Sequence, residues 1–170
     1  MKAYMCLTCK VGSYNKILNE LQELKVPRSD IFLLFGTFDI LIQFSRLKNL
    51  DEFIKMWFNP VRMIGANDAL ITKTFTFIVI SEGPLLTEVP FAFIFLNTKP
   101  QTLDPIKDTL LKIPEVLSAD TVFGHYDLIC SIKAKDRVDL ERIISHIHSN
   151  VFGIDGAMTV IVTMETMFFI

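Results

Sequence analysis

The chain reads Phe35-Gly36-Thr37-Phe38-Asp39 in its first half and Phe123-Gly124-His125-Tyr126-Asp127 in its second. Both stretches follow one pattern: an aromatic residue, Gly, any residue, an aromatic residue and Asp. Each lies between two apolar runs, which predicts a hairpin of two strands joined by a tight turn. Gly36 and Gly124 are predicted to supply a positive φ there. One turn in the same setting twice predicts an internal repeat.

The residues around the first turn predict the order strand, helix, strand, strand, helix, strand. Apolar residues at helical spacing follow Ser13, the predicted helix cap, and Pro27 ends that helix. A second helix begins near Leu50 and is predicted to stop at Pro60. The four strands are expected at residues 2–10, 31–35, 38–45 and 69–80.

The second half repeats this order. Its first helix begins at Thr102 or Asp104 and ends at Pro114, and its second begins at Asp136, which pairs with Asp139 in a capping arrangement. The four strands are expected at residues 91–98, 116–123, 126–134 and 157–167.

The two halves keep a nearly constant register. Phe35 and Phe123 are 88 positions apart, Ala3 and Ala92 are 89 apart, and Leu50 and Leu140 are 90 apart. Constant spacing within elements and small drifts at loops indicate a duplicated domain.

The element order predicts an α+β fold made of two ferredoxin-like βαββαβ repeats, each with an antiparallel sheet. Apolar residues on both faces of each last strand predict that the sheets pack as a dimeric α+β sandwich or barrel. We assign residues 1–80 to repeat 1, residues 81–89 to a linker and residues 90–170 to repeat 2.

Composition limits the function classes. Hydrophobic residues make up 51% of the 170, which predicts an apolar interface between repeats or between chains. The net charge of −2 and the lack of a Lys/Arg block argue against direct nucleic-acid binding. No apolar run is long enough for a membrane span and no signal peptide is evident, so we expect a cytoplasmic protein.

The sequence predicts neither a metal site nor a cofactor. Cys6 and Cys9 form a C-x-x-C pair, but residues three apart on a strand point to opposite faces, and Cys130 is isolated. His146 and His148 are two apart near a helix end and point to different faces. The cysteines are therefore interpreted as structural.

The second half resembles the Lrp/AsnC effector domain, also called the RAM domain (regulation of amino acid metabolism). The Gly-x-Tyr-Asp turn is its most characteristic element. The first half resembles the same domain more weakly, and there Phe38 replaces the tyrosine. The matching stretches occur in the family's order: Ala92–Thr98, Ile113–Val116, Phe123–Leu128, Gly153-Ile154 and Thr159–Val162.

The resemblance implies a domain that forms dimers through its sheet and assembles further. It implies a small-molecule effector, commonly an amino acid, that binds at an interface between domains near the turn. Such regulators carry an N-terminal helix-turn-helix, whereas this chain begins on its first strand. We therefore expect a stand-alone tandem module, as a homo-oligomer or an intramolecular pseudo-dimer, whose partner is a regulator with a helix-turn-helix.

The candidate ligand-binding residues are those of the two turns. Asp39 and Asp127 either accept backbone N–H bonds and so pin the turn, or bind the α-ammonium group of an amino acid. Tyr126 suits an interface pocket, and His125 is expected to be exposed at the tip. The full set is Gly124, His125, Tyr126, Asp127, Gly36, Thr37, Phe38 and Asp39, with the second turn as the working site.

Two other functions are compatible with the sequence. A cofactor-free enzyme on a dimeric α+β barrel would need a polar constellation in a cavity, and His125 with Asp127 or Asp39 is the only candidate pair. A purely structural assembly subunit would need no ligand, and the changed first turn favours this function to some extent.

Overall fold

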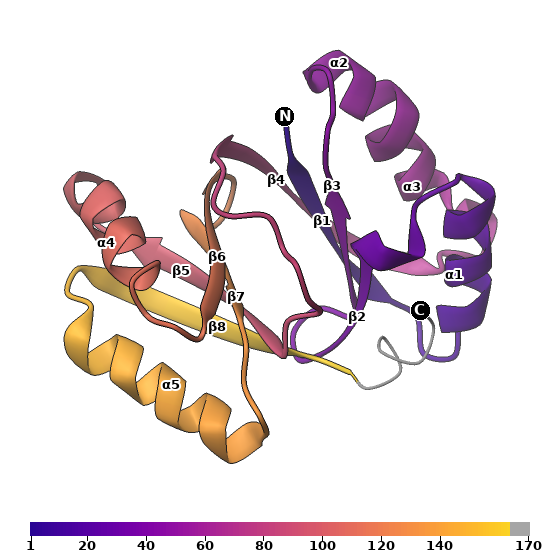
Figure 1. Cartoon of the computed structure of the whole chain (residues 1–170). Helices are drawn as coiled ribbons and strands as arrows, with labels where there is room; N and C mark the ends of the chain where they lie inside the picture. The colour runs from indigo at the N-terminus through magenta and orange to yellow at the C-terminus, as the bar shows by residue number, and fades with distance from the viewer. Residues whose placement is uncertain (164–170) are drawn as a thin grey trace. The chain divides into compact units, whose positions relative to one another are not determined.

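The computed structural model describes residues 1–163, and the chain divides into two compact units (Figure 1). Unit 1 comprises Met1–Ile78 and, at the end of the described chain, Thr163. The backbone N–H of Thr163 donates to the carbonyl of Leu33 at 2.8 Å. Unit 2 comprises Val79–Val162.

Unit 1 contains a four-stranded antiparallel sheet. Strand β1 pairs with β3 and β4, and β2 pairs with β3, so the strand order is β4-β1-β3-β2. Strand β4 runs on past the boundary, and its last three residues belong to unit 2. The elements are β1 (Ala3–Cys9), α1 (Tyr14–Glu23), β2 (Ile31–Phe35), β3 (Ile40–Phe44), α2 (Leu50–Phe53), a π-helical turn (Ile54–Phe58), α3 (Asn59–Met63) and β4 (Ile71–Ser81), with short 3₁₀ turns at Arg28–Asp30 and Ala66–Asp68.

The core of unit 1 lies between this sheet and its helices. Alternate residues of β1 point to this core, because successive side chains of a strand face opposite sides. They meet the apolar face of α1 and the ring of Phe53. The buried side chains from β1, α1 and α2 are Ala3, Met5, Leu7, Ile17, Leu18, Leu21 and Phe53.

The second helical segment does not stop at Pro60, and that prediction is wrong. Helix α3 begins at Asn59 with Pro60 in its first turn, directly after the π-helical turn. The N–H of Asn59 donates to the carbonyl of Ile54, five residues back. Proline has no N–H and crowds the preceding helical turn, and a wider π turn accommodates it without ending the helix.

Ser13 occupies the N-cap position of α1 but does not cap it through its side chain. Its hydroxyl donates to the carbonyl of Lys10 at 2.6 Å instead. The predicted start of the helix is therefore right, whereas the predicted capping bond is wrong.

Unit 2 contains a second four-stranded antiparallel sheet with the equivalent order β8-β5-β7-β6. The predicted strand 126–134 is longer than the observed β7, and the observed β8 begins three residues before the predicted strand 157–167. Residues 164–167 of that prediction lie outside the described residues. The elements are β5 (Ala92–Thr98), a 3₁₀ turn (Pro100–Thr102), α4 (Leu103–Leu110), β6 (Val116–Phe123), β7 (Leu128–Ile132), α5 (Arg137–Asn150) and β8 (Ile154–Val162).

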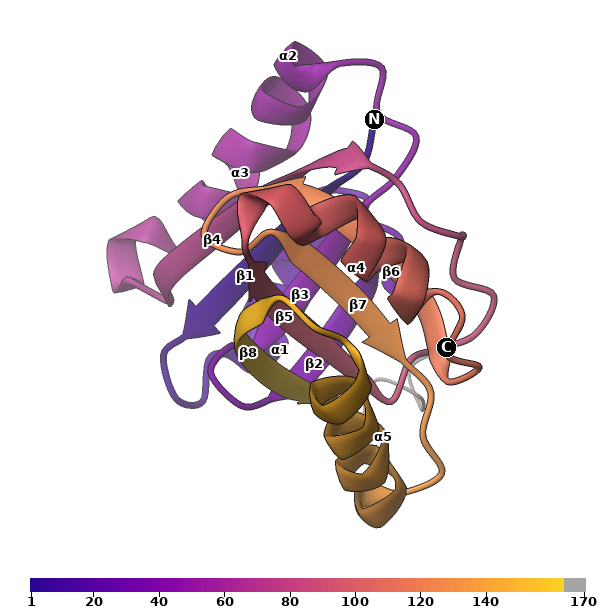
Figure 2. The ribbon, with the colours of Figure 1, turned by 90° about the vertical axis from the view of Figure 1, so that its left-hand side faces the viewer.

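Helices α4 and α5 cover one face of the unit 2 sheet (Figure 2). Ile106 and Leu110 of α4 and Ile143 of α5 pack with alternate residues of β5, among them Ile94. Each unit thus combines an antiparallel sheet with a helical layer, which confirms the α+β class.

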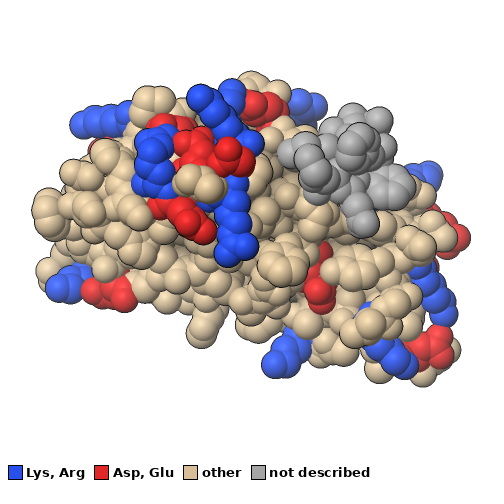
Figure 3. All heavy atoms as spheres, turned by 90° about the horizontal axis from the view of Figure 1, so that it is seen from below, with Lys and Arg blue, Asp and Glu red and all other residues tan. Residues whose placement is uncertain are grey.

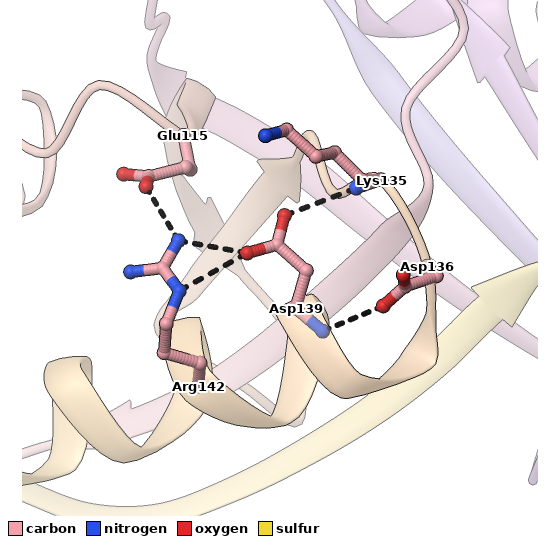
Figure 4. A network of polar contacts seen from close by, with 5 residues as sticks. All are labelled: Glu115, Lys135, Asp136, Asp139 and Arg142. Atoms are coloured by element: carbon pink, nitrogen blue, oxygen red, sulfur yellow. Dashed lines mark hydrogen bonds and ion pairs between the residues drawn. The ribbon is translucent and has the colours of Figure 1, made fainter.

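The solvent side of α5 carries charges of both signs. Seen from below, basic and acidic side chains lie side by side there rather than forming a patch of one sign (Figure 3), and Arg137 and Arg142 of this helix contact Glu141 and Asp139. Arg142 joins this helix to the start of β6, because its guanidinium bonds Glu115 at 2.9 Å and Asp139 at 2.8 Å (Figure 4).

The N-terminus of α5 has the predicted capping arrangement. The Asp136 carboxylate accepts the backbone N–H of Asp139 at 2.8 Å, and the Asp139 carboxylate accepts that of Lys135 at 3.0 Å (Figure 4). Two otherwise unpaired N–H groups at the helix start are satisfied in this way.

Replacing the capping carboxylate should destabilise the protein. We expect Asp136→Ala to lower the free energy of unfolding by about 1 kcal/mol, measured by urea denaturation. The matched control is Asp136→Asn, which keeps an oxygen that can accept the Asp139 N–H. Equal losses for the two variants would contradict the cap.

The Arg142 network should make stability depend on pH. A hydrogen bond from Arg142 lowers the pKa of Glu115, and the Lys135 N–H followed by Arg142 lowers that of Asp139. A carboxylate whose pKa is lower in the folded state than in the unfolded state contributes its full stabilisation at pH values above the unfolded-state pKa. That stabilisation is lost as the pH falls through the folded-state pKa.

Arg142→Gln should therefore be less stable than the wild type at neutral pH, with a difference that shrinks below about pH 4. Urea denaturation over a pH series measures this difference. Arg137→Gln is the control, because its contact with Glu141 is long, at 3.3 Å, and both side chains are exposed. A pH-independent difference for Arg142→Gln would contradict the prediction.

Candidate functional site

Turn 1 (residues 35–39) and turn 2 (residues 123–127) join the hairpin strands of their units. Phe35 and Phe123 are each 73% exposed. Gly36 has a φ of 144°, as predicted, whereas Gly124 does not have a positive φ, so that prediction is wrong. The exposed tips also contain Thr37 and His125, the latter as expected.

The aspartate of each turn is fixed to the first strand of its unit. Asp39 accepts the Cys9 N–H through Oδ2 at 2.7 Å and donates its own N–H to the Leu7 carbonyl at 2.9 Å. The pinning role foreseen for Asp39 is therefore present, although its partner is the neighbouring strand rather than the turn itself.

Asp127 makes the same pair of bonds in unit 2. Its Oδ2 accepts the Thr98 N–H at 2.8 Å, and its N–H donates to the Leu96 carbonyl at 2.9 Å. Thr98 and Leu96 stand 89 positions after Cys9 and Leu7. The two units thus share a framework of hydrogen bonds as well as a sequence pattern.

The second carboxylate oxygen distinguishes the two aspartates. Oδ1 of Asp39 accepts the Tyr14 hydroxyl at 3.0 Å. Leu103 stands 89 positions after Tyr14 and has no hydroxyl, so Asp127 lacks this donor. Thr98 beside it has a buried hydroxyl without a hydrogen-bond partner among the described residues. Turn 2 therefore offers acceptor groups that turn 1 does not.

The central aromatic residues also differ. Phe38 is buried and its ring lies 5.2 Å from that of Phe75. Tyr126 is half-buried, packs against Phe95 at 5.5 Å, and its hydroxyl lies 3.5 Å from the Met158 sulfur.

The His125 ring stands perpendicular to that of Tyr126, with the ring centroids 5.3 Å apart. His125 is otherwise exposed, so its imidazole is not held as a buried acid or base. The predicted residues of turn 2 are brought together on one hairpin. Those of turn 1 lie on the other unit.

A buried polar cluster that sequence reasoning missed lies elsewhere in unit 2. The Lys107 amine donates to the Ser81 carbonyl and hydroxyl at 2.9 and 2.8 Å and to the Glu82 carbonyl at 3.2 Å. Asp120 is fully buried and accepts the Gly83 N–H at 2.7 Å. A lysine directly after Ile106 on an amphipathic helix gives no sequence signal for such a role.

Gly83 allows this cluster to form. An added Cβ would lie 2.5 Å from the Ala119 carbonyl oxygen and 2.8 Å from the Ala119 nitrogen. Because those atoms are backbone, they cannot move aside as the end of a side chain would. The segment after β4 is therefore held against β6.

The cysteines are free and protected as thiols. Burial raises the pKa of Cys6 well above its usual value. Burial and the nearby Asp39 raise the pKa of Cys9 to about 12, and burial and Asp120 raise that of Cys130 to about 12. The thiolate is the reactive form, so these environments suit packing rather than redox chemistry or metal binding.

Residues 1–163 contain no cluster of three or more His, Cys, Asp and Glu side chains that would hold a metal ion. Over the same residues, no helix is both long and apolar enough to cross a membrane.

Comparison with known proteins gives one family. Residues 91–167 match the family described as the Lrp/AsnC ligand binding domain. The HTH-type transcriptional regulator FL11 of Pyrococcus furiosus is 27% identical over 148 residues, which covers 86% of this chain and 85% of that protein.

Solved structures match the chain over almost its full length. The siroheme decarboxylase NirDL, in complex with an iron-uroporphyrin III analogue, gives a TM-score of 0.59 at 6% identity over 96% of this chain and 71% of that chain. A putative monooxygenase from Lactobacillus acidophilus gives 0.56 at 10% identity over 95% and 92%. At these identities the likeness concerns the fold alone.

The hydroxyl bond to Asp39 should contribute to stability in unit 1. We expect Tyr14→Phe to lower the free energy of unfolding by about 1–2 kcal/mol, because the bond is to an ionised carboxylate. Asp39→Ala should cost more, since it also leaves the Cys9 N–H without an acceptor. Denaturant titration measures both, and an unchanged midpoint for Tyr14→Phe would refute the assignment.

Proposed function

Because the second half of the chain carries a Lrp/AsnC ligand binding domain, we propose that this protein senses a small-molecule effector, an amino acid, through turn 2. Effector binding would then alter assembly with a transcription regulator. The observation that carries the proposal is the Asp127 carboxylate, which is held by the Thr98 N–H and lacks the hydroxyl donor that Asp39 receives.

The chemistry of turn 2 suits an amino acid. The Asp127 oxygen not bonded to Thr98 is an acceptor for an α-ammonium group, and a charge-assisted bond of this kind is stronger than a neutral one. Backbone N–H groups at the tip, around Gly124, can donate to the α-carboxylate. The half-buried ring of Tyr126 adds apolar surface with a polar end.

We infer that the chain arose by duplication, with repeats at residues 1–80 and 90–170 and a linker at 81–89. The matched bonds of Asp39 and Asp127 support this inference. In this proposal turn 1, with its buried Phe38 and its occupied aspartate, is the structural counterpart of turn 2. The effector site requires an interface between two such domains, supplied by the other repeat or by a second chain.

The partner in this proposal is a regulator that carries a helix-turn-helix. The relationship to FL11, whose name describes such a regulator, supports a role in transcription. Direct DNA contact by this chain is not part of the proposal. The net charge of the chain is −2, and the charged side chains of α5 are of both signs.

Ligand-linked stabilisation tests the proposal. Each of the protein amino acids is added at millimolar concentration and the melting temperature is measured. A ligand at 100 times its Kd should stabilise the folded state by about 2.7 kcal/mol. No shift with any amino acid would refute an amino-acid effector.

Matched variants locate the site. Asp127→Asn keeps an acceptor for the Thr98 N–H but removes the negative charge, and should abolish the shift. Leu103→Tyr introduces at α4 the hydroxyl that Tyr14 has in unit 1 and should weaken binding by competing for Asp127. Asp39→Asn is the control and should leave the shift unchanged.

The same samples separate the alternatives. A structural assembly subunit would give no shift and a constant mass by light scattering. A cofactor-free enzyme would consume a stabilising ligand, which mass spectrometry of the solution would detect. No specific contact in the structure favours either alternative. The solved structures of similar fold that are named as enzymes are only 6 and 10% identical to this chain.

A further inference from the structure

The helical layer of unit 1 has a groove that the proposed function does not use. It lies between the end of α1 and helix α3 and has a volume of about 420 Å³. Its two sides differ in chemistry, one being acidic and the other apolar. The lining residues are Glu20, Glu23, Leu24, Pro60, Met63 and Ile64.

The apolar side continues along the helix beyond the groove. Met63 is 67% exposed and Met56 is 58% exposed. Pro60 and Met63 are three residues apart on α3, and Met56 precedes them on the π-helical turn, so the three belong to one continuous helical segment, which we call the methionine stripe. Exposed methionines are flexible and polarizable, so such a stripe adapts to apolar side chains of a partner.

The acidic side has no close cation of its own. Lys16, one turn before Glu20, bonds Asp68 at 2.8 Å and interacts with Glu20 only by charge attraction. Arg62, on the opposite helix, stacks on the Phe58 ring at 4.9 Å. Among the described residues, no ion pair engages the Glu20 or Glu23 carboxylate, so both can accept bonds from a positively charged partner.

The same surface of unit 2 has different chemistry. The residues 89 positions after Glu20 and Glu23 are Thr109 and Lys112, and Asn150 stands 90 positions after Pro60. Since the helices of the two units share their buried positions, the acidic and methionine-rich surface is a property of unit 1 rather than of the fold.

We propose that this groove, with its methionine stripe, docks a basic amphipathic helix of a partner protein. The apolar face of that helix would lie on Met56, Pro60 and Met63, and its Lys or Arg residues would meet Glu20 and Glu23. This is the usual way in which a helix binds in a groove, with charge complementarity fixing its orientation.

A second copy of this chain does not match these requirements. The basic side chains on its described helices are already engaged: Lys107 is buried, and the others bond acidic residues or stack on a ring. The ion-paired ones are Lys16, Lys55, Arg137 and Arg142. We therefore assign the unpaired basic helix to a separate protein.

The test uses a fluorescein-labelled peptide of about 18 residues, long enough to be helical, with Leu at i, i+3, i+4 and i+7 and Lys elsewhere. Fluorescence anisotropy with the full chain should show saturable binding. The same peptide with Glu in place of Lys should not bind.

Variants of the groove should weaken this binding. We expect the double variant Glu20→Lys, Glu23→Lys to raise the Kd roughly tenfold, most strongly at low salt. Met63→Ser should raise it several-fold at any salt concentration. The control, Asp104→Lys with Asp108→Lys, makes the same change in net charge on exposed positions of α4 and should leave the Kd within about twofold.

Equal weakening by the control pair would show non-specific attraction and overturn the proposal. So would tight binding of the Glu peptide. Light scattering of the chain alone provides a further check, because a concentration-dependent dimer that Met63→Ser abolishes would identify a second copy as the occupant instead. None of these outcomes depends on whether turn 2 binds an amino acid.

Discussion

Each unit depends on one hydrogen bond, in which the carboxylate of the last turn residue, an aspartate, accepts the N–H of the last residue of the first strand. Through this bond and the return bond from the aspartate N–H, the start of the third strand is aligned with the end of the first. Antiparallel register is sensitive to a slip of one residue, which would exchange the core face and the opposite face of the sheet. An aspartate that is hydrogen-bonded to the end of the neighbouring strand disfavours such a slip. Both halves of the chain contain this aspartate.

The two copies of this bond have diverged in what surrounds them. In unit 1 a tyrosine hydroxyl occupies the other oxygen of Asp39 and a buried phenylalanine closes the turn. In unit 2 leucine stands in place of that tyrosine, and the turn keeps a half-buried Tyr126. A saturated carboxylate contributes mainly to stability, whereas a carboxylate with a spare acceptor can also bind a ligand. Two units with the same bond allow this division, because one can maintain the fold while the other keeps its polar groups available.

Hydrophobic periodicity and proline positions were sufficient to predict the order of the strands and helices, because burial of one face is a local property of the sequence. The same reasoning placed the cap at Asp136, where the pairing with Asp139 lies within one helical turn. It was wrong at Pro60, since a π turn in which Asn59 bonds Ile54 accommodates the proline, and no local sequence pattern marks such a turn. The hydrogen bond between Tyr14 and Asp39 joins residues 25 apart in sequence, and that between Lys107 and Ser81 joins residues 26 apart. Neither bond therefore produces a local sequence pattern.

The segment held by Lys107 and Asp120 has a consequence for engineering the chain. A segment near the boundary between two units would ordinarily be expected to tolerate insertions equally well along its length. Here Lys107 and Asp120 fasten Ser81 to Gly83, and Gly83 has no space for an added Cβ, whereas Leu85, two residues beyond Gly83, is 66% exposed. A protease site or an affinity tag should therefore be introduced after Pro84, and a chain divided for separate expression should keep residues 79–83 with the second half.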